Sequence, residues 1–445
     1  MDAALREELA DLIAIPSVSA DSVHAGDVTR AAEWIRDHIR GSGGEAELVD
    51  LDGKQLMIGE IKASTGAGGA PTVICYGHFD VQPPPPLELW DTEPFELTEQ
   101  GEYLYARGIV DDKGQLYMLL RAARELAEAG ELPVNLRFCC DGEEEVGGHT
   151  IVDFLAADER GADAAVIFDS GMIRRGVPAF NVATRGVVYF HVRVRTGQRD
   201  LHSGMYGGAA MNATHALIQT LSGVLPANGR LPEPLRAGIA TPTDEELAGW
   251  KELPTGADEL AEQGARPADP KGADEFYLRT FAEPSVDVNG VEGGSPQLQK
   301  TVLPVQADAN VSIRLAPGQS VDEIAPEFEH LLREAAPEGA DVEIERWSAA
   351  GPGLVDPESP VIKLGQEAFE RALGVRPLLV RSGGTLPIVP ALSDKGIATI
   401  ITGFGLPDSN VHSPNERLLA EYLPLGIAAA RELFLAFVRV PVRTA

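Results

Sequence analysis

Hydrophobic and polar positions along the N-terminal part of the chain predict alternating helices and strands. Apolar residues recur at helical spacing in 31–40 and 115–129, and short apolar runs of strand length separate and follow these segments. The runs lie at 56–61, 71–76, 134–140 and 164–168. The runs 134–140 and 164–168 are almost wholly apolar, which is typical of strands covered on both faces of a parallel or mixed sheet. The pattern therefore predicts an α/β domain with a central mixed sheet flanked by helices.

From about Val187 the pattern changes to strict alternation of apolar and polar residues, as in strands with one exposed face. The predicted elements are strands at 187–195, 306–315 and 342–347, and helices after 209 and over 321–335. The segment 225–275, rich in Pro, Gly and Glu, has little periodicity and is expected to form loops. These features predict an α+β layer in a second domain. Apolar strand and helix patterns return at 397–402 and 418–438.

Length and charge narrow the possible functions. A chain of 445 residues favours two domains, because single hydrophobic cores stop growing near roughly 250–300 residues. A net charge of -31, from 37 Lys and Arg against 68 Asp and Glu, would repel phosphate backbones and anionic lipids, so no nucleic acid or membrane partner is expected. A secretory signal and a membrane span are not evident, and three cysteines suit reduced thiols. We therefore expect a cytoplasmic protein.

Polar residues follow several of the predicted strands, where ligands tend to bind in open α/β sheets. His78 leaves the run 71–76 with Asp80 two residues on, a spacing at which a carboxylate can orient a metal-bound imidazole, although a surface turn is the commoner meaning of such a pair. Asp111 and Asp112 precede the helix at 115, and capping of that helix alone would explain them. Each pair by itself is a weak indication of metal binding.

Four acids at 141–145 follow the strand 134–140, and such a cluster is costly unless cations neutralise it, although a solvated acidic loop is the alternative. Asp169 follows the run 164–168, and His412 lies in a polar segment near the C-terminus. Two histidines and three or four carboxylates at strand ends are the ligands of a dinuclear site for divalent ions. A remaining Glu could take a proton from a metal-bridging water, so the pattern indicates hydrolysis.

The chain resembles a known family through seven ordered motifs spread over nearly its whole length. The family is that of the co-catalytic metallopeptidases, which includes carnosinase-like cytosolic dipeptidases, aminoacylases, succinyl-diaminopimelate desuccinylase and glutamate carboxypeptidase. The motifs are GHFDVQP (77–83), ARGIVDDKG (106–114), DGEEEVGG (141–148), DLHSGMYGG (200–208), KTVLP with SIRLAPGQ (300–319), RSGGTLPI (381–388) and VHSPNE (411–416). DLHSGMYGG and the arginine of SIRLAPGQ are most similar to the carnosinase-like dipeptidase branch.

The resemblance implies two divalent metal ions per subunit, zinc or manganese with cobalt possible. Asp111 would bridge them, His78 and Asp169 would complete one site, and Glu145 and His412 the other. The Asp111–Asp112 peptide would be cis.

The resemblance also assigns catalytic roles, with Glu144 as the general base and Asp80 as the partner of His78. Three consecutive glutamates leave the alignment ambiguous. Alignment on the flanking glycines gives Glu144 as base and Glu145 as ligand, whereas a slip by one residue would give Glu143 and Glu144.

The resemblance implies a catalytic domain at 1–182 and 383–445. It also implies an inserted lid domain at 183–382 that mediates homodimerisation. His202 would reach the partner subunit's active site and stabilise the developing oxyanion. Further substrate contacts are implied for Thr301, Arg314, Gly383, Gly384 and Thr385.

The expected activity is hydrolysis of dipeptides or short peptides, in which a metal-bridging hydroxide attacks the amide carbonyl and the C-terminal amino acid is released. An N-acyl amino acid deacylase of the aminoacylase or desuccinylase type could use the same metal centre, because the catalytic residues do not encode what lies beyond the scissile bond. A non-catalytic binding protein with a degenerate site is a third hypothesis. It is disfavoured because every metal and base position is filled.

Overall fold

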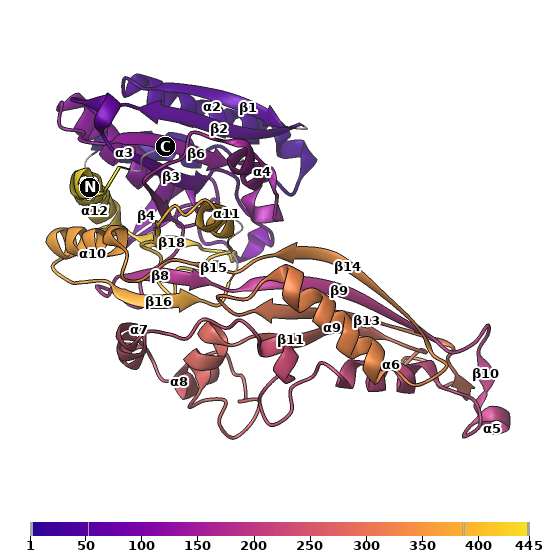
Figure 1. Ribbon diagram of the computed structural model, residues 1–445. Coiled ribbons are helices and arrows are strands. Elements are labelled where there is room, and N and C mark those ends of the chain that lie inside the picture. The colour runs from indigo at the N-terminus through magenta and orange to yellow at the C-terminus, as the bar shows by residue number, and fades with distance from the viewer. Residues whose placement is uncertain (1–2, 52, 385, 387, 443–445) are drawn as a thin grey trace. The chain divides into compact units, whose positions relative to one another are not determined.

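The computed structural model describes residues 3–51, 53–384, 386 and 388–442, which form two compact units (Figure 1). The first unit comprises Met1–Val182, Val355–Val380 and Pro387–Ala445, and the second comprises Ala183–Leu354 and Arg381–Leu386. Among the helices that the structure describes, none combines the length and apolar character that crossing a membrane requires.

A six-stranded sheet in the order β1-β2-β6-β3-β7-β17 forms the centre of the first unit. Its strands are β1 (Glu45–Leu51), β2 (Lys54–Ile61), β3 (Thr72–His78), β6 (Asn135–Asp141), β7 (Ala164–Phe168) and β17 (Thr399–Thr402). β1, β2 and β6 pair antiparallel, and β6, β3, β7 and β17 pair parallel. The parallel strands are almost completely buried, which explains why their sequences are apolar on both faces. The predicted central mixed sheet is confirmed.

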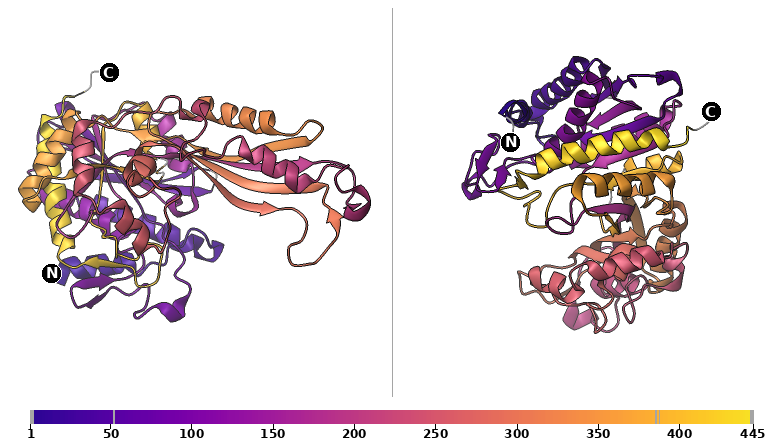
Figure 2. Two further views of the ribbon diagram at one scale, coloured as in Figure 1. Left: turned by 90° about the horizontal axis from the view of Figure 1, so that it is seen from below. Right: turned by 90° about the vertical axis from the view of Figure 1, so that its left-hand side faces the viewer.

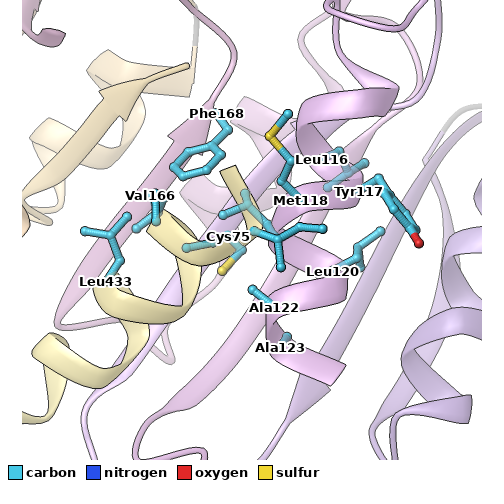
Figure 3. Close-up of a cluster of buried hydrophobic side chains, with 14 of the residues drawn as sticks. Cys75, Leu116, Tyr117, Met118, Leu120, Ala122, Ala123, Val166, Phe168 and Leu433 are labelled. Carbon is cyan, nitrogen blue, oxygen red and sulfur yellow. The ribbon is translucent and has the colours of Figure 1, made fainter. Parts of the chain in front are cut away.

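Helices cover both faces of this sheet. They are α1 (Ala3–Ile13), α2 (Ala25–Gly41), α3 (Lys113–Glu128), α4 (Thr150–Ala157), α10 (Pro360–Leu373), α11 (Ile388–Asp394) and α12 (Tyr422–Ala436). α3 and α12 pack against one another over one face, where Leu116 and Met118 of α3 and Leu433 of α12 meet Cys75 and Phe168 of the sheet (Figure 3). α4 and α11 contact each other as well as the sheet. This arrangement confirms the predicted α/β class.

Two three-stranded sheets lie outside the central sheet. One has the order β18-β5-β4 and consists of β4 (Thr98–Gln100), β5 (Tyr103–Tyr105) and β18 (Arg417–Leu419). The other has the order β15-β8-β16 and consists of β8 (Ala179–Thr184), β15 (Gly353–Leu354) and β16 (Leu378–Ser382). The helix pattern expected from residue 418 therefore starts later, because Leu418 pairs with Leu104 in a strand.

The second unit contains a four-stranded antiparallel sheet in the order β11-β13-β9-β14. Its strands are β9 (Gly186–Arg195), β11 (Ser285–Glu292), β13 (Gln306–Leu315) and β14 (Asp341–Ala350). Alternate residues of β9 are buried, as its sequence predicts, and they pack under α6 (Ala213–Ser222) and α9 (Val321–Ala335). The two helices lie side by side along the sheet (Figure 2). This unit has the expected α+β character.

Shorter elements extend the second unit. They are the strand pair β10 (Leu201–His202) and β12 (Val302–Leu303), and the helices α5 (Ser203–Tyr206), α7 (Asp244–Gly249) and α8 (Gly256–Glu262). The segment expected to form only loops thus contains α7 and α8. Their first turns are capped by the side chains of Thr243 and Thr255, a local signal that the weak periodicity concealed.

The boundary expected for the inserted domain at residue 382 differs from the structure. Residues 355–380 belong to the first unit, because α10 packs against α12 and β17. Phe369 of α10 meets Phe180 edge-on at a ring-centroid distance of 5.0 Å and Phe168 at 6.2 Å. The apolar face of α10 completes the core of the first unit.

Candidate active site

The polar residues that follow the parallel strands of the first unit converge at one edge of its sheet. His78 ends β3, and Asp169 directly follows its neighbour β7. Asp111 precedes α3, Glu144 and Glu145 follow β6 in a short 3-10 helix, and His412 lies in the loop before β18. Parallel strands align their carboxyl ends, so residues far apart in sequence meet there.

Asp111 lies between the two histidines, with one carboxylate oxygen facing each. His78 Nε2 is 2.9 Å from Asp111 Oδ1 and 3.8 Å from Asp169 Oδ1. On the other side, His412 Nε2 is 2.8 Å from Asp111 Oδ2 and 3.1 Å from Glu145 Oε2. Two groups result, His78–Asp111–Asp169 and Asp111–Glu145–His412, and within each the potential ligand atoms lie within 4.8 Å of one another.

The electrostatics of this cluster fit two bound cations. Burial raises the pKa of Asp169 well above its usual range, and the nearby Asp111 adds to the effect. Burial opposes protonation of His78, but its hydrogen bonds with Asp111 and Asp80 raise its pKa well above the ordinary value. The hydrogen bonds to Asp111 and Glu145 raise the pKa of His412 to about 10. Carboxylates gathered this closely repel one another, and divalent cations between them would remove the repulsion.

Asp80 and Gln82 form hydrogen bonds that position His78, Glu144 and Glu145. The buried Asp80 carboxylate is 3.3 Å from His78 Nδ1 and accepts the backbone N–H groups of Glu144 and Glu145. Gln82 donates its backbone N–H and its amide to the two oxygens of Glu145, at 3.1 and 2.8 Å. Sequence reasoning gave Gln82 no role, although it lies within the GHFDVQP motif.

The three consecutive glutamates have different surroundings. Glu143 accepts the backbone N–H and hydroxyl of Thr150 and lies 3.0 Å from Lys54 Nζ. Glu145 is the one that lies beside His412. Glu144 belongs to neither ligand group, and burial followed by the charge of Asp111 raises its pKa, although His78 opposes the shift.

Two further features occur in the loops around Asp111 and Asp169. The peptide between Asp111 and Asp112 is cis, as the resemblance implies. Gln115, at the start of α3, donates to the carbonyls of Val110 and Ser170 and accepts the N–H of Phe404. Its amide thereby connects the loops that carry Asp111 and Asp169, a role that sequence reasoning missed.

The remaining candidate residues lie in the second unit and form two separate groups. His202 of β10 and Thr301 are exposed neighbours, because Ser203 N donates to Thr301 O at 2.9 Å. Arg314, at the far end of β13, lies beside Arg185, whose backbone N–H donates to Gly384 O at 3.1 Å. The part of β13 from Gln306 to Arg314 lies between the groups along the chain, and it spans roughly 27 Å at about 3.4 Å per residue. Gly383 accepts a hydrogen bond from Arg185, and Thr385 lies outside the described residues.

The family model described as Peptidase family M20/M25/M40 matches residues 74–436. The chain belongs to this family. Similar M20 relatives include a cysteinylglycine-S-conjugate dipeptidase of Corynebacterium striatum, 28% identical over 92% of this chain and 90% of the relative. The Cys-Gly metallodipeptidase DUG1 of Saccharomyces cerevisiae is also 28% identical, over 92% and 90%. Human Beta-Ala-His dipeptidase is 26% identical over 93% and 86%.

Solved M20 structures have the same fold. A metallo-carboxypeptidase from Sulfolobus solfataricus has a TM-score of 0.84 at 25% identity and covers 98% of this chain and 100% of its own. Dug1p from S. cerevisiae has a TM-score of 0.74 at 25% identity, with 98% and 96% covered. The sequence resemblance to the carnosinase-like branch is confirmed, and the protein is a hydrolase of the metallopeptidase class.

Proposed function

We propose that this M20 protein is a metal-dependent dipeptidase that hydrolyses dipeptides or short peptides and releases the C-terminal amino acid. The observation that carries the proposal is the pair of ligand groups that share Asp111, with Glu144 beside them but outside both. The names of the similar relatives, dipeptidases for Cys-Gly and β-Ala-His, support small peptides as the substrate class.

In this proposal His78, Asp111 and Asp169 hold one metal ion, and Asp111, Glu145 and His412 hold the other. The chemistry supplied by two bound divalent cations is polarisation of the scissile carbonyl and a lowered pKa for the attacking water. The imidazole and carboxylate ligands suit zinc or manganese, with cobalt as a further possibility.

Glu144 is the general base of the proposed reaction. Its carboxylate takes a proton from the attacking water and passes it to the nitrogen of the leaving amine. Burial, which raises the pKa of Glu144, helps the carboxyl group to hold that proton between the two transfers. Asp80 fixes the orientation of His78 and, through the backbone N–H groups, the position of Glu144.

The second unit supplies the substrate contacts in the proposal. Arg314 binds the C-terminal carboxylate, because its planar guanidinium can donate two parallel hydrogen bonds, and Gly384 allows close approach of the backbone. Thr301 and Thr385 complete this set. The unit then acts as a lid over the bound peptide.

A homodimer is part of the proposal, with His202 acting on the partner subunit's substrate. Its support is the separation along β13, which keeps His202 and Thr301 away from Arg314 within one chain. A site that needs all of these residues is completed more easily by two copies than by one.

A cytoplasmic location is also proposed, since Cys75, Cys139 and Cys140 are buried free thiols.

Turnover by reloaded protein tests the function. The protein is stripped with a chelator, reloaded separately with manganese or zinc, and offered dipeptides, longer peptides and N-acyl amino acids. We expect preferential cleavage of dipeptides with at least one metal. Selective cleavage of N-acyl amino acids would overturn the substrate class while keeping the catalytic residues, and absence of turnover with both metals would overturn the enzymatic role.

A further inference from the structure

Glu416 lies just before β18, four residues after His412, and its side chain is completely buried. Its carboxylate accepts four hydrogen bonds from a single turn of the chain. Oε2 accepts Arg107 Nη1 at 2.7 Å and Gly108 N at 3.0 Å, and Oε1 accepts Val110 N at 2.8 Å and Asp111 N at 3.1 Å.

This turn carries the carboxylate that both metal-ligand groups share. Without Glu416, the buried backbone N–H groups of Gly108 and Val110 and the partly buried one of Asp111 would lose their acceptor, and Arg107, only 1% exposed, would lose its counter-ion. Hydrogen bonds to a charged acceptor are stronger and better oriented than neutral ones. The carboxylate therefore defines the backbone position from which Asp111 projects.

The loop before Glu416 needs an anchor of this kind. Asn410, His412 and Asn415 all have positive φ angles, between 55° and 62°, which non-glycine residues seldom adopt. The Asn410 amide donates to Asn415 O, and Arg107 Nη2 donates to Ser413 O at 3.3 Å. His412 itself is 54% exposed at its side chain, so packing alone does little to fix it.

Glu416 thus joins two segments that lie about 300 residues apart in the sequence, the turn of Asp111 and the loop of His412. We propose that Glu416 is a positioning residue that sets the spacing between Asp111 and His412, and thereby the affinity of the Asp111–Glu145–His412 group for its metal ion. The inference rests on the metal centre of the proposed function. Glu416 contacts the backbone of a ligand residue and acts through it.

A buried ion pair of the same kind in the second unit offers a matched control. Glu246 and Arg381 have side chains 0% and 2% exposed, and Arg381 donates to both Glu246 oxygens at 2.6 and 3.3 Å. Glu246 also accepts the backbone N–H of Thr243, so replacing Glu246 leaves a similar set of donors without their charged acceptor. Any general effect of losing a buried carboxylate should therefore be seen with E246Q as well.

The experiment measures binding of Mn²⁺ alone to chelator-stripped full-length protein by isothermal titration calorimetry, for wild type, E416Q, E416D, E246Q and H412A. We expect E416Q to weaken one of two binding events by about 10- to 100-fold, a loss typical of residues that orient metal ligands. The weakened event should be the one that H412A abolishes. E246Q should lower the melting temperature and leave both events as in wild type.

E416D provides the second test and remains decisive if E416Q fails to fold. Its shorter side chain keeps the charge but cannot reach all four donors. We therefore expect E416D to bind Mn²⁺ with an affinity between those of wild type and E416Q. If E416Q does not fold, E416D should still bind more weakly than wild type. Wild-type affinity in folded E416D and E416Q would overturn the inference, and so would an equal loss in E246Q. A wild type that binds two ions without cleaving peptides would contradict the proposed function alone, since the affinity comparison would still decide the role of Glu416.

Discussion

Substitution of the three consecutive glutamates should produce three different defects, which makes them the sharpest test of the catalytic assignment. E144Q removes the proposed base but no metal ligand, because Glu144 belongs to neither ligand group. Loss of general-base catalysis typically costs about 10²- to 10⁴-fold in turnover, which corresponds to about 2.7–5.5 kcal/mol of transition-state stabilisation. We therefore expect kcat to fall by that factor while two metal ions remain bound.

The neighbouring substitutions are the matched controls. E143Q replaces a carboxylate that Thr150 and Lys54 hold in place, so it should reduce the free energy of unfolding by about 1 kcal/mol and change kcat by only a few fold. E145Q should weaken metal binding, because Glu145 Oε2 lies 3.1 Å from His412 Nε2.

The assay combines steady-state kinetics on one dipeptide with metal content measured by mass spectrometry on the same samples. A large loss of kcat in E143Q, with metal loss in E144Q, would show that base and ligand are shifted by one residue. Full activity in E144Q would refute its role as base altogether.

Three further predictions concern stability and assembly. The hydrogen bond with His38 lowers the pKa of Glu8 to about 2 despite partial burial, so this carboxylate should contribute stability above about pH 4.5 that is lost as the pH falls toward 2. In urea titrations E8Q should lower the free energy of unfolding by about 1–2 kcal/mol near pH 7, after allowance for solvent screening, and by much less near pH 2; an equal loss at both pH values would contradict this. Phe369→Ala should cost about 3–5 kcal/mol of unfolding free energy, because the ring fills the core beneath α10, and a loss below 1 kcal/mol would refute that packing. Mixing inactive H202A with inactive E144Q should restore about a quarter of wild-type turnover if the subunits exchange freely, whereas no recovery would contradict donation of His202 to the partner subunit.

Much of the first unit could be predicted from the sequence because its signals are local. The apolar strands and the polar residues that follow them predicted where ligands would gather. The pattern did not predict the order of the strands, yet that order determines which polar residues meet in the site. β3 and β7 are parallel neighbours, with Tyr76 paired to Ile167, and this brings His78 beside Asp169.

The features that could not be predicted depend on contacts between distant segments. The sequence pattern does not assign residues 355–380 to either unit, whereas the packing of α10 against α12 and β17, with Phe369 against Phe168 and Phe180, assigns them to the first. Glu416 was visible as part of a motif, but its four donors lie about 300 residues earlier, and a single sequence contains no signal for that pairing. Among the substrate-contact candidates, His202 lies near Thr301 because it pairs with Val302, and no local pattern in the sequence specifies that pairing.

Because the chain is synthesised from its N-terminus, the sheet of the first unit and the site at its edge are not completed at the same time. Four of its sheet strands, β1, β2, β3 and β6, come from the first 141 residues, and β7 ends at Phe168. The edge strand β17, the proposed ligand His412 and Glu416 all follow residue 398. A nascent chain can therefore form most of the sheet while its hydrolytic centre is still incomplete. If His412 is a metal ligand as proposed, synthesis that stops short of it yields a product without the second ligand group, and peptide cleavage would depend on translation having passed this point.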